Sequence, residues 1–376
     1  MTEAKGDLVP ISGHDHYLKR DYSHFAYVPH PLPYEPILKL STHKAAADAA
    51  LAIGRLDFAV RRLPNPALMV RPALRREAQS TSALEGTYAT FGEILESDFA
   101  DEASLSAEVR EVRNYIRAAE RALELIKVKP ICITMLCELQ AILVKGTSGD
   151  NADRGRLRTG PVYIGERHRG IEASRFVPPP DNVVGDGMAE WEKWVNTADD
   201  VPLIIDLALA HYQFETLHPF SDGNGRLGRL VATLQLVAEG ALTYPVLNLS
   251  PWLEARRDEY KDQLLRVSKT GDFDEWIVFF CEAIQAQAVR SSRENFLYYV
   301  AKKYLQGAGR DDLRTERIHY SERAFQILQQ EPRPGGFPIE EVRSFFDGSD
   351  LPLVLALAEN ALKSDQPADM EAHYRR

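Results

Sequence analysis

One stretch of twelve residues, His218 to Arg229, most constrains the fold, because it separates two segments with helical periodicity. Residues 202–217 before it carry apolar side chains at helical spacing, and residues 227–240 after it repeat that pattern and end at Gly240. The stretch itself, His-Pro-Phe-Ser-Asp-Gly-Asn-Gly-Arg-Leu-Gly-Arg, is here called the glycine turn. The sequence therefore predicts two amphipathic helices joined by a turn with more glycine than packing requires.

The glycine turn has the residue types of a phosphate site. Its glycines let backbone N–H groups crowd together, and the following helix directs its positive end toward them. Arg226 and Arg229 are three residues apart, so both project from one face of that helix, where guanidinium groups suit phosphate oxygens. Asp222 offers an oxygen ligand for Mg²⁺, and His218 can take up a proton near neutral pH. A lone histidine or glycine turn is usually structural, but together these groups predict phosphoryl or nucleotidyl transfer.

The pattern His-Pro-Phe-x-Asp-Gly-Asn-Gly-Arg-x-x-Arg at 218–229 resembles the full signature of Fic-domain (Fic/DOC family) proteins, most of which transfer AMP from ATP to a protein hydroxyl. Every fixed position is filled, and the resemblance extends more loosely over residues 30–300. It implies a mainly α fold: a Fic-type helical bundle with a small β-hairpin flap and an N-terminal helical extension. A small C-terminal helical unit, a degenerate winged-helix-like one, would complete the chain.

The resemblance also implies a role for each residue of the turn. His218 would remove the proton from a Tyr, Thr or Ser hydroxyl of a protein target, which attacks the α-phosphate of ATP. Asp222 would hold Mg²⁺, Arg226 the β-phosphate and Arg229 the γ-phosphate. The residues expected to bind the phosphates of ATP are Gly223, Asn224, Gly225, Arg226, Leu227, Gly228 and Arg229. The chain would then be a protein adenylyltransferase, with the protein itself among its targets.

A second motif lies upstream, at the end of a helix predicted over 69–84. The segment 81–86, Thr-Ser-Ala-Leu-Glu-Gly, resembles the inhibitory motif of the same family, Ser/Thr-x-x-x-Glu-Gly/Asn. This implies that Glu85, with Thr81 and Gly86 beside it, reaches Arg229 and occupies the space of the γ-phosphate. A carboxylate would thereby neutralise a cation that otherwise waits for an anion. Without the downstream signature, an ordinary surface glutamate would be the better interpretation.

Residues 154–170 contain four glycines around a short apolar run, which favours a strand or hairpin over a helix. In Fic proteins the corresponding region is a flap that aligns a target segment by strand addition. The residues expected to dock the target are Val162, Tyr163, Ile164 and Gly165. An ordinary surface hairpin stays open as the alternative for each side chain.

Nucleotide preference and reaction type are less constrained. The family often has two adjacent tyrosines beside the adenine, but here Tyr260 is followed by Lys261, which could cover the base or meet a phosphate. A Doc-like kinase is disfavoured, because its loop departs from Gly-Asn-Gly. A bifunctional or mainly de-AMPylating enzyme that uses Glu85 remains an alternative. An ATP-sensing regulatory or DNA-associated protein is a further one.

Composition and charge limit the classes of partner that the sequence predicts. The net charge of −10 argues against general binding to nucleic acid or anionic membranes. The three cysteines form no metal or disulfide framework, no apolar signal core begins the chain, and no apolar run reaches membrane-spanning length. We therefore expect a soluble, cytoplasmic protein without a membrane partner, and the sequence leaves a homodimer open.

The chain is expected to have four parts. Residues 1–36 are dotted with prolines and predict an extended tail. Residues 37–105 predict an N-terminal helical domain with the inhibitory motif, and 106–308 the catalytic core. Residues 309–376 predict a C-terminal helical module, for which DNA binding is disfavoured because Lys and Arg are not clustered. Packing or assembly is the expected role of that module.

Overall fold

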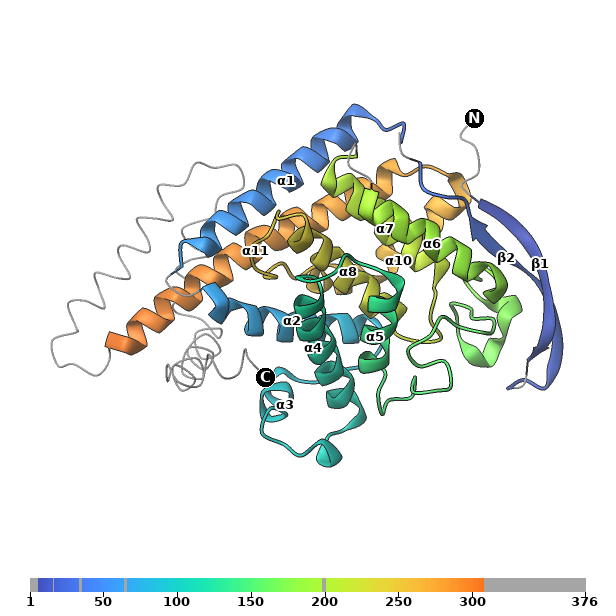
Figure 1. Ribbon diagram of the computed structural model, residues 1–376, viewed down its shortest axis with the longest axis horizontal. Helices are drawn as coiled ribbons and strands as arrows, with labels where there is room; N and C mark the ends of the chain where they lie inside the picture. The colour runs from blue at the N-terminus through green and yellow to red at the C-terminus, as the bar shows by residue number, and fades with distance from the viewer. Residues whose placement is uncertain (1–5, 16, 34–35, 64–65, 198–200, 308–376) are drawn as a thin grey trace. The chain divides into compact units, whose positions relative to one another are not determined.

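The computed structural model describes residues 6–15, 17–33, 36–63, 66–197 and 201–307 (Figure 1). These residues are mainly helical, with one two-stranded antiparallel sheet, as the sequence predicts. No helix among them is both long and apolar enough to cross a bilayer. The predicted C-terminal module, 309–376, lies outside the described residues.

The chain divides into two compact units. One comprises residues 1–58 and 73–289, and the other residues 59–72 and 290–376. The first unit contains the glycine turn, the predicted flap and the predicted inhibitory motif. The site described below therefore lies within a single unit, and the four-part division of the chain stays a prediction.

The helices predicted over 69–84, 202–217 and 227–240 are present to within three residues at each end, as α2, α7 and α8. In chain order they are α1 (Leu40–Arg61), α2 (Val70–Leu84), α3 (Phe91–Glu96), α4 (Ala107–Leu125), α5 (Ile133–Leu143), α6 (Asp181–Thr197), α7 (Leu203–Leu217), α8 (Asn224–Ala238), α9 (Ser250–Glu254), α10 (Arg257–Thr270) and α11 (Asp274–Gly307). Short 3₁₀ turns are η1 (Pro66–Met69), η2 (Glu102–Ser104), η3 (Arg167–Arg169) and η4 (Ile171–Ala173).

Helix α7 is the centre of the first unit, since nearly all of its side chains are buried. Three tryptophans cover it, and each donates its indole N–H to an acceptor on α7. Trp191 of α6 donates to the Ala210 carbonyl at 2.9 Å, and Trp276 of α11 donates to the Ala208 carbonyl at 2.7 Å. Trp194 donates to the buried Asp206 carboxylate at 2.6 Å. These bonds fix the helix that ends at the glycine turn.

The sheet lies in a different place from the one predicted. Its strands, β1 (Gly6–Asp15) and β2 (Arg20–Pro29), form a hairpin from residues expected to be an unpaired extended tail. Its inner face packs on a small apolar cluster of Ala26, Ile171 and Val177. In addition, the Tyr27 amide donates to the Val177 carbonyl at 2.9 Å. The two strands are each other's partners, whereas the bond to Val177 joins residues 150 positions apart and has no local signal in the sequence.

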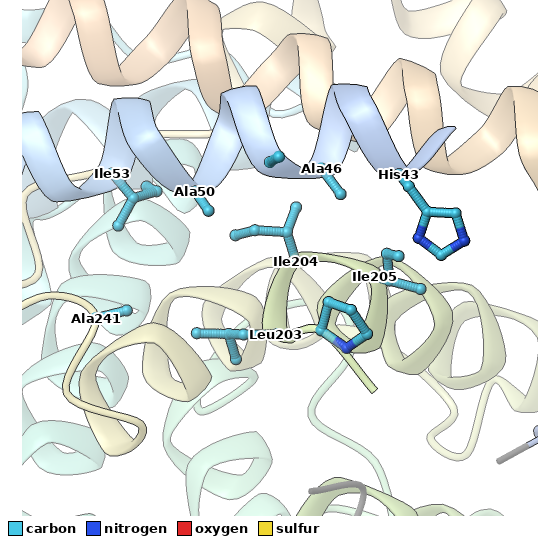
Figure 2. Close-up of a pocket in the computed structure, with 10 residues that line it drawn as sticks. His43, Ala46, Ala50, Ile53, Leu203, Ile204, Ile205 and Ala241 are labelled. Carbon is cyan, nitrogen blue, oxygen red and sulfur yellow. The ribbon is translucent and has the colours of Figure 1, made fainter. Parts of the chain in front are cut away.

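An apolar cavity of about 240 Å³ lies between α1 and the start of α7 (Figure 2). Small and branched apolar side chains line it, among them Ala46, Ala50, Ile53 and Ile204. Its lining contains no residue of the glycine turn, so this cavity is separate from the predicted site.

Replacing Trp191 by alanine is expected to lower the free energy of unfolding by about 3–5 kcal/mol, since a large buried ring and a hydrogen bond to α7 are lost. Trp191→Phe keeps part of the ring contact with Phe214 and should cost clearly less. Urea unfolding followed by circular dichroism measures both. Equal unfolding midpoints for the alanine variant and the wild type would contradict this account of the core.

Candidate active site

The glycine turn has a tightly fixed backbone. His218 ends α7 in the left-handed conformation, with φ at 47°, and its amide donates to the Phe214 carbonyl. Gly223, with φ at 86°, begins α8, where a Cβ would meet Leu143 at 2.8 Å. Between them Phe220 is fully buried, and the buried Asn224 side chain bonds to both its amide and its carbonyl.

The start of α8 leaves backbone donors available for an anion. Its N-cap is Gly223, which has no side chain to accept a hydrogen bond from the first-turn amides. Gly225 lies in that first turn, so the backbone can be approached closely. With the positive end of the helix dipole at the same point, the geometry fits the phosphate binding that the sequence predicts.

Arg229 reaches from α8 to the end of α2. Its guanidinium donates to the Thr81 hydroxyl at 2.7 Å, to the Thr81 carbonyl at 3.2 Å and to Glu85 Oε1 at 2.6 Å. The Arg229 side chain is only 2% exposed, whereas that of Glu85 is 41% exposed. The long-range contact between Glu85 and Arg229 expected from the resemblance is therefore present in the structure.

The Glu85 carboxylate also lies directly against the glycine turn, since a Cβ on Gly225 would collide with its Oε1. Desolvation acts to raise the pKa of Glu85, but the Arg229 guanidinium more than offsets it, and the pKa is lowered. Glu85 is thus an anion beside the first turn of α8. Its Oε1 accepts a hydrogen bond from the buried Arg229 guanidinium.

Arg226 is held by two other carboxylates. It is 3% exposed, and its Nη1 lies 3.1 Å from Glu111 Oε2 of α4 while its Nη2 lies 3.0 Å from Asp222 Oδ1. The sequence predicts Arg226 and Asp222 as site residues, but it gave no reason to single out Glu111. A glutamate at a polar position of an amphipathic helix carries no mark of such a contact.

His218 is set up as a neutral base. Its Nδ1 lies 3.3 Å from the Glu215 carbonyl, and because a carbonyl can only accept, the proton belongs on Nδ1 and Nε2 is free to act. Burial lowers the pKa of His218 to about 4, the Glu215 carbonyl opposes this, and Arg158 adds to it. The imidazole is therefore uncharged at neutral pH.

Arg158, from the predicted flap region, is a residue that sequence reasoning missed. Its side chain is buried and donates to the carbonyls of His218 at 2.8 Å, Gly160 at 3.0 Å, Leu217 at 3.4 Å and Pro179. Its amide donates to the Pro219 carbonyl at 2.9 Å. One cation thus satisfies the carbonyls at the end of α7 and fixes the backbone that carries His218.

Asp222 fits the magnesium role through its chemistry. Its side chain is 37% exposed beside the turn, so the carboxylate is accessible. Among the described residues no group of three or more His, Cys, Asp or Glu side chains could hold a metal unaided. Magnesium in such a site takes one protein carboxylate and completes its shell with substrate phosphates and water. The magnesium role of Asp222 stays a prediction.

Tyr260 and Lys261, the two residues considered for contact with the adenine, lie in different surroundings. Tyr260 is 4% exposed and its hydroxyl lies 2.8 Å from His211 Nε2, so it is part of the core beneath Arg229. Lys261 is half-buried, and burial followed by the nearby Arg257 lowers its pKa. Lys261 and Glu85 interact electrostatically, which puts the lysine at the edge of the site.

The predicted flap contains one bridge rather than a regular hairpin. Ile164 pairs with Phe176, through an Ile164 amide bond of 2.8 Å to the Phe176 carbonyl and an Arg175 amide bond of 2.8 Å in return. Val162, Tyr163 and Ile164 are half-buried and Gly165 is exposed. The target-docking role of these four residues stays a prediction.

Comparison with known proteins gives two family matches. The model described as Fic/DOC family N-terminal matches residues 43–124, and the model described as Fic/DOC family matches residues 130–236. Protein adenylyltransferase fic-1 of Caenorhabditis elegans is 30% identical over 160 residues, which is 40% of this chain and 28% of the relative. A probable protein adenylyltransferase of Aquifex aeolicus is 28% identical over 121 residues, or 32% of this chain and 35% of the relative. The matches thus span about a third or less of these relatives.

Solved structures show the same fold. A Fic family protein from Desulfovibrio desulfuricans superposes with a TM-score of 0.60 at 22% identity, covering 84% of this chain and 89% of that one. A Fic-domain-containing signaling protein from Bacteroides thetaiotaomicron gives a TM-score of 0.51 at 20% identity, covering 65% and 96%. The predicted mainly helical, Fic-type fold is confirmed.

Replacing Arg158 by methionine is expected to move the pKa of His218 up from about 4 toward its ordinary value of about 6.5, because a nearby cation is lost and the turn loosens. Arg156→Met, which removes an exposed arginine two residues away, should leave it unchanged. Titration of the histidine signals by NMR measures the shift. An unaltered pKa of His218 in the Arg158→Met protein would contradict the role of Arg158 in positioning the imidazole.

Proposed function

Since the chain belongs to the Fic/DOC family and its distant homologues are protein adenylyltransferases, we propose that it transfers AMP from ATP to a hydroxyl of a protein target. The target residue is a Tyr, Thr or Ser, and the protein itself is among the candidate targets. We further propose that Glu85 restrains this activity through its contact with Arg229.

One observation carries the proposal: the neutral imidazole of His218, the uncapped start of α8 and the buried Arg229 belong to one short turn. A base, backbone donors for an anion, and a cation paired with an exchangeable carboxylate are the parts that nucleotidyl transfer needs. No apolar ligand pocket is required, since the substrate is recognised through its phosphates.

In the proposed reaction, the target hydroxyl oxygen attacks the α-phosphorus of ATP. A new P–O bond forms to the target, the bond from the α-phosphorus to the bridging oxygen breaks, and pyrophosphate leaves. His218 Nε2 accepts the hydroxyl proton, while Nδ1–H stays bonded to the Glu215 carbonyl. Arg158 keeps the imidazole in place by holding the His218 carbonyl.

The phosphates are bound by the chain's own donors. The amides near Asn224 and Gly225 stabilise the charge that develops on the α-phosphate, and Arg226 and Arg229 bind the β- and γ-phosphates. Asp222 would hold Mg²⁺, which neutralises phosphate charge when bound. The flap would align the target by strand addition, and Lys261 would contact the nucleotide.

Restraint follows from competition for Arg229. The guanidinium is buried and already bonded to Glu85, so the γ-phosphate has to displace that carboxylate to reach it. Nucleotide that enters while Glu85 stays in place meets a negative charge beside Gly225, which opposes its correct alignment. Transfer should therefore be slow until the contact breaks.

Glu85→Gly is expected to increase transfer of label from ATP labelled on the α-phosphate by about tenfold or more, since a hydrogen bond to a charged group is worth about 1.5–3 kcal/mol. The assay incubates each protein alone and with lysate and measures protein-bound label. Glu96→Gly, which removes an exposed glutamate from the end of α3, is the control and should behave as the wild type. Equal labelling by both variants would remove Glu85 from its inhibitory role, and label from the γ-phosphate alone would indicate kinase chemistry.

His218→Ala is expected to abolish transfer while nucleotide binding stays largely intact, because the imidazole takes the proton and does not bind phosphate in this scheme. The variant is best made together with Glu85→Gly, so that loss is measured from the active form. His43→Ala, which removes an exposed imidazole outside the site, serves as the control. Retained transfer in the His218 variant would exclude it as the base.

A further inference from the structure

Glu111 of α4 joins two parts of the site that the proposed mechanism treats separately. Its Oε2 accepts a hydrogen bond from the Thr87 hydroxyl at 2.8 Å and one from Arg226 Nη1 at 3.1 Å. Thr87 lies two residues after Glu85, in the segment that leaves α2. A single carboxylate oxygen therefore connects the inhibitory segment to the arginine expected to bind the β-phosphate.

Each of the two arginines of the glycine turn is paired with a different glutamate. Arg229 bonds to Glu85 at the end of α2, and Arg226 bonds to Glu111 of α4. Each guanidinium is at most 3% exposed, but the carboxylates differ: the Glu111 side chain is 15% exposed and that of Glu85 41%. The pair of Arg226 with Glu111 is therefore the better shielded from solvent. The helices that precede the turn in the chain thus supply one carboxylate to each cation.

The charges around Arg226 oppose the approach of a nucleotide. Arg226 contacts Asp222 as well as Glu111, so the cation is flanked by two carboxylates. A phosphate that approaches this group meets an excess of negative charge. Magnesium at Asp222 would neutralise the negative charge of that carboxylate, and the negative charge of Glu111 would remain.

We propose that Glu111 restrains Arg226 as Glu85 restrains Arg229, and that Thr87 couples the two contacts. This inference rests on the proposed function only in assuming that the glycine turn binds a nucleotide. It assigns to Glu111 a part in nucleotide affinity that neither the sequence motif nor the family match identifies. When Glu85 and the segment behind it move, the bond from Thr87 to Glu111 is strained or broken, and Arg226 becomes available at the same time.

The test measures equilibrium binding of a magnesium complex of a non-hydrolysable ATP analogue by calorimetry, on the full-length chain. Glu111→Gln removes the charge but keeps hydrogen-bonding atoms, and it should tighten binding about tenfold. Glu108→Gln removes an exposed carboxylate one turn earlier on α4 and should change nothing. Circular dichroism and the Tm of each variant establish that it is folded.

Thr87→Val provides a second variant that keeps every charge and cuts only the link. It should tighten binding by a few-fold in the wild-type background, because Glu111 loses the bond that holds its carboxylate against Arg226. It should add nothing in the Glu111→Gln background, because Thr87 acts on Arg226 only through the charge of Glu111. Additive effects of the two substitutions would overturn the coupling. Unchanged or weaker binding in a folded Glu111→Gln protein would overturn the restraint and leave Glu111 as a structural partner of Arg226.

Failure of the inference is distinguishable from failure of the proposed function. Glu85→Gly is measured in the same binding experiment. If it binds the analogue more tightly than the wild type while Glu111→Gln does not, only the inference falls. If no variant, Glu85→Gly included, binds the analogue, the nucleotide site itself is wrong and the inference falls with it.

Discussion

A buried guanidinium needs an anion, and much of the site follows from that requirement at Arg229. Its side chain is 2% exposed, so leaving it without a partner would be costly. In this structure Glu85 and Thr81 meet the need from the end of α2. A phosphate could satisfy the same cation, and we therefore propose that a segment more than 140 residues away in the chain competes with substrate. In that proposal, restraint and substrate binding meet the same electrostatic requirement of Arg229.

The position of the His218 imidazole depends on a related requirement at the other end of the turn. Helix α7 ends at His218, where carbonyl groups lose their helical partners. Arg158 satisfies the carbonyls of Leu217 and His218 from one buried side chain. The strained left-handed conformation of His218 is thereby maintained by packing and hydrogen bonds. The imidazole is thus positioned through the His218 carbonyl, which the Arg158 side chain holds, and through Nδ1, which faces the Glu215 carbonyl.

The sequence predicted the helices around the turn because periodicity is a local property, and it predicted the contact between Glu85 and Arg229 because a motif encodes it. It could not predict Glu111 or Arg158, since a charged residue on a helix or in a loop looks the same whether it meets water or a buried partner. It also left the first strands unpaired. They pair with each other as a hairpin, and the further bond from the Tyr27 amide to the Val177 carbonyl joins residues too far apart in the chain for a local pattern to reveal.

The bond between the Tyr27 amide and the Val177 carbonyl has a consequence for the proposed docking of a target segment at the flap. It connects β2 to the strand segment that pairs with Ile164, so backbone hydrogen bonds run from β1 through to the flap. A peptide added beyond Ile164 would become the outermost member of this ladder. Removal of the β1–β2 hairpin would leave the Val177 carbonyl without this donor and would loosen the segment that pairs with Ile164.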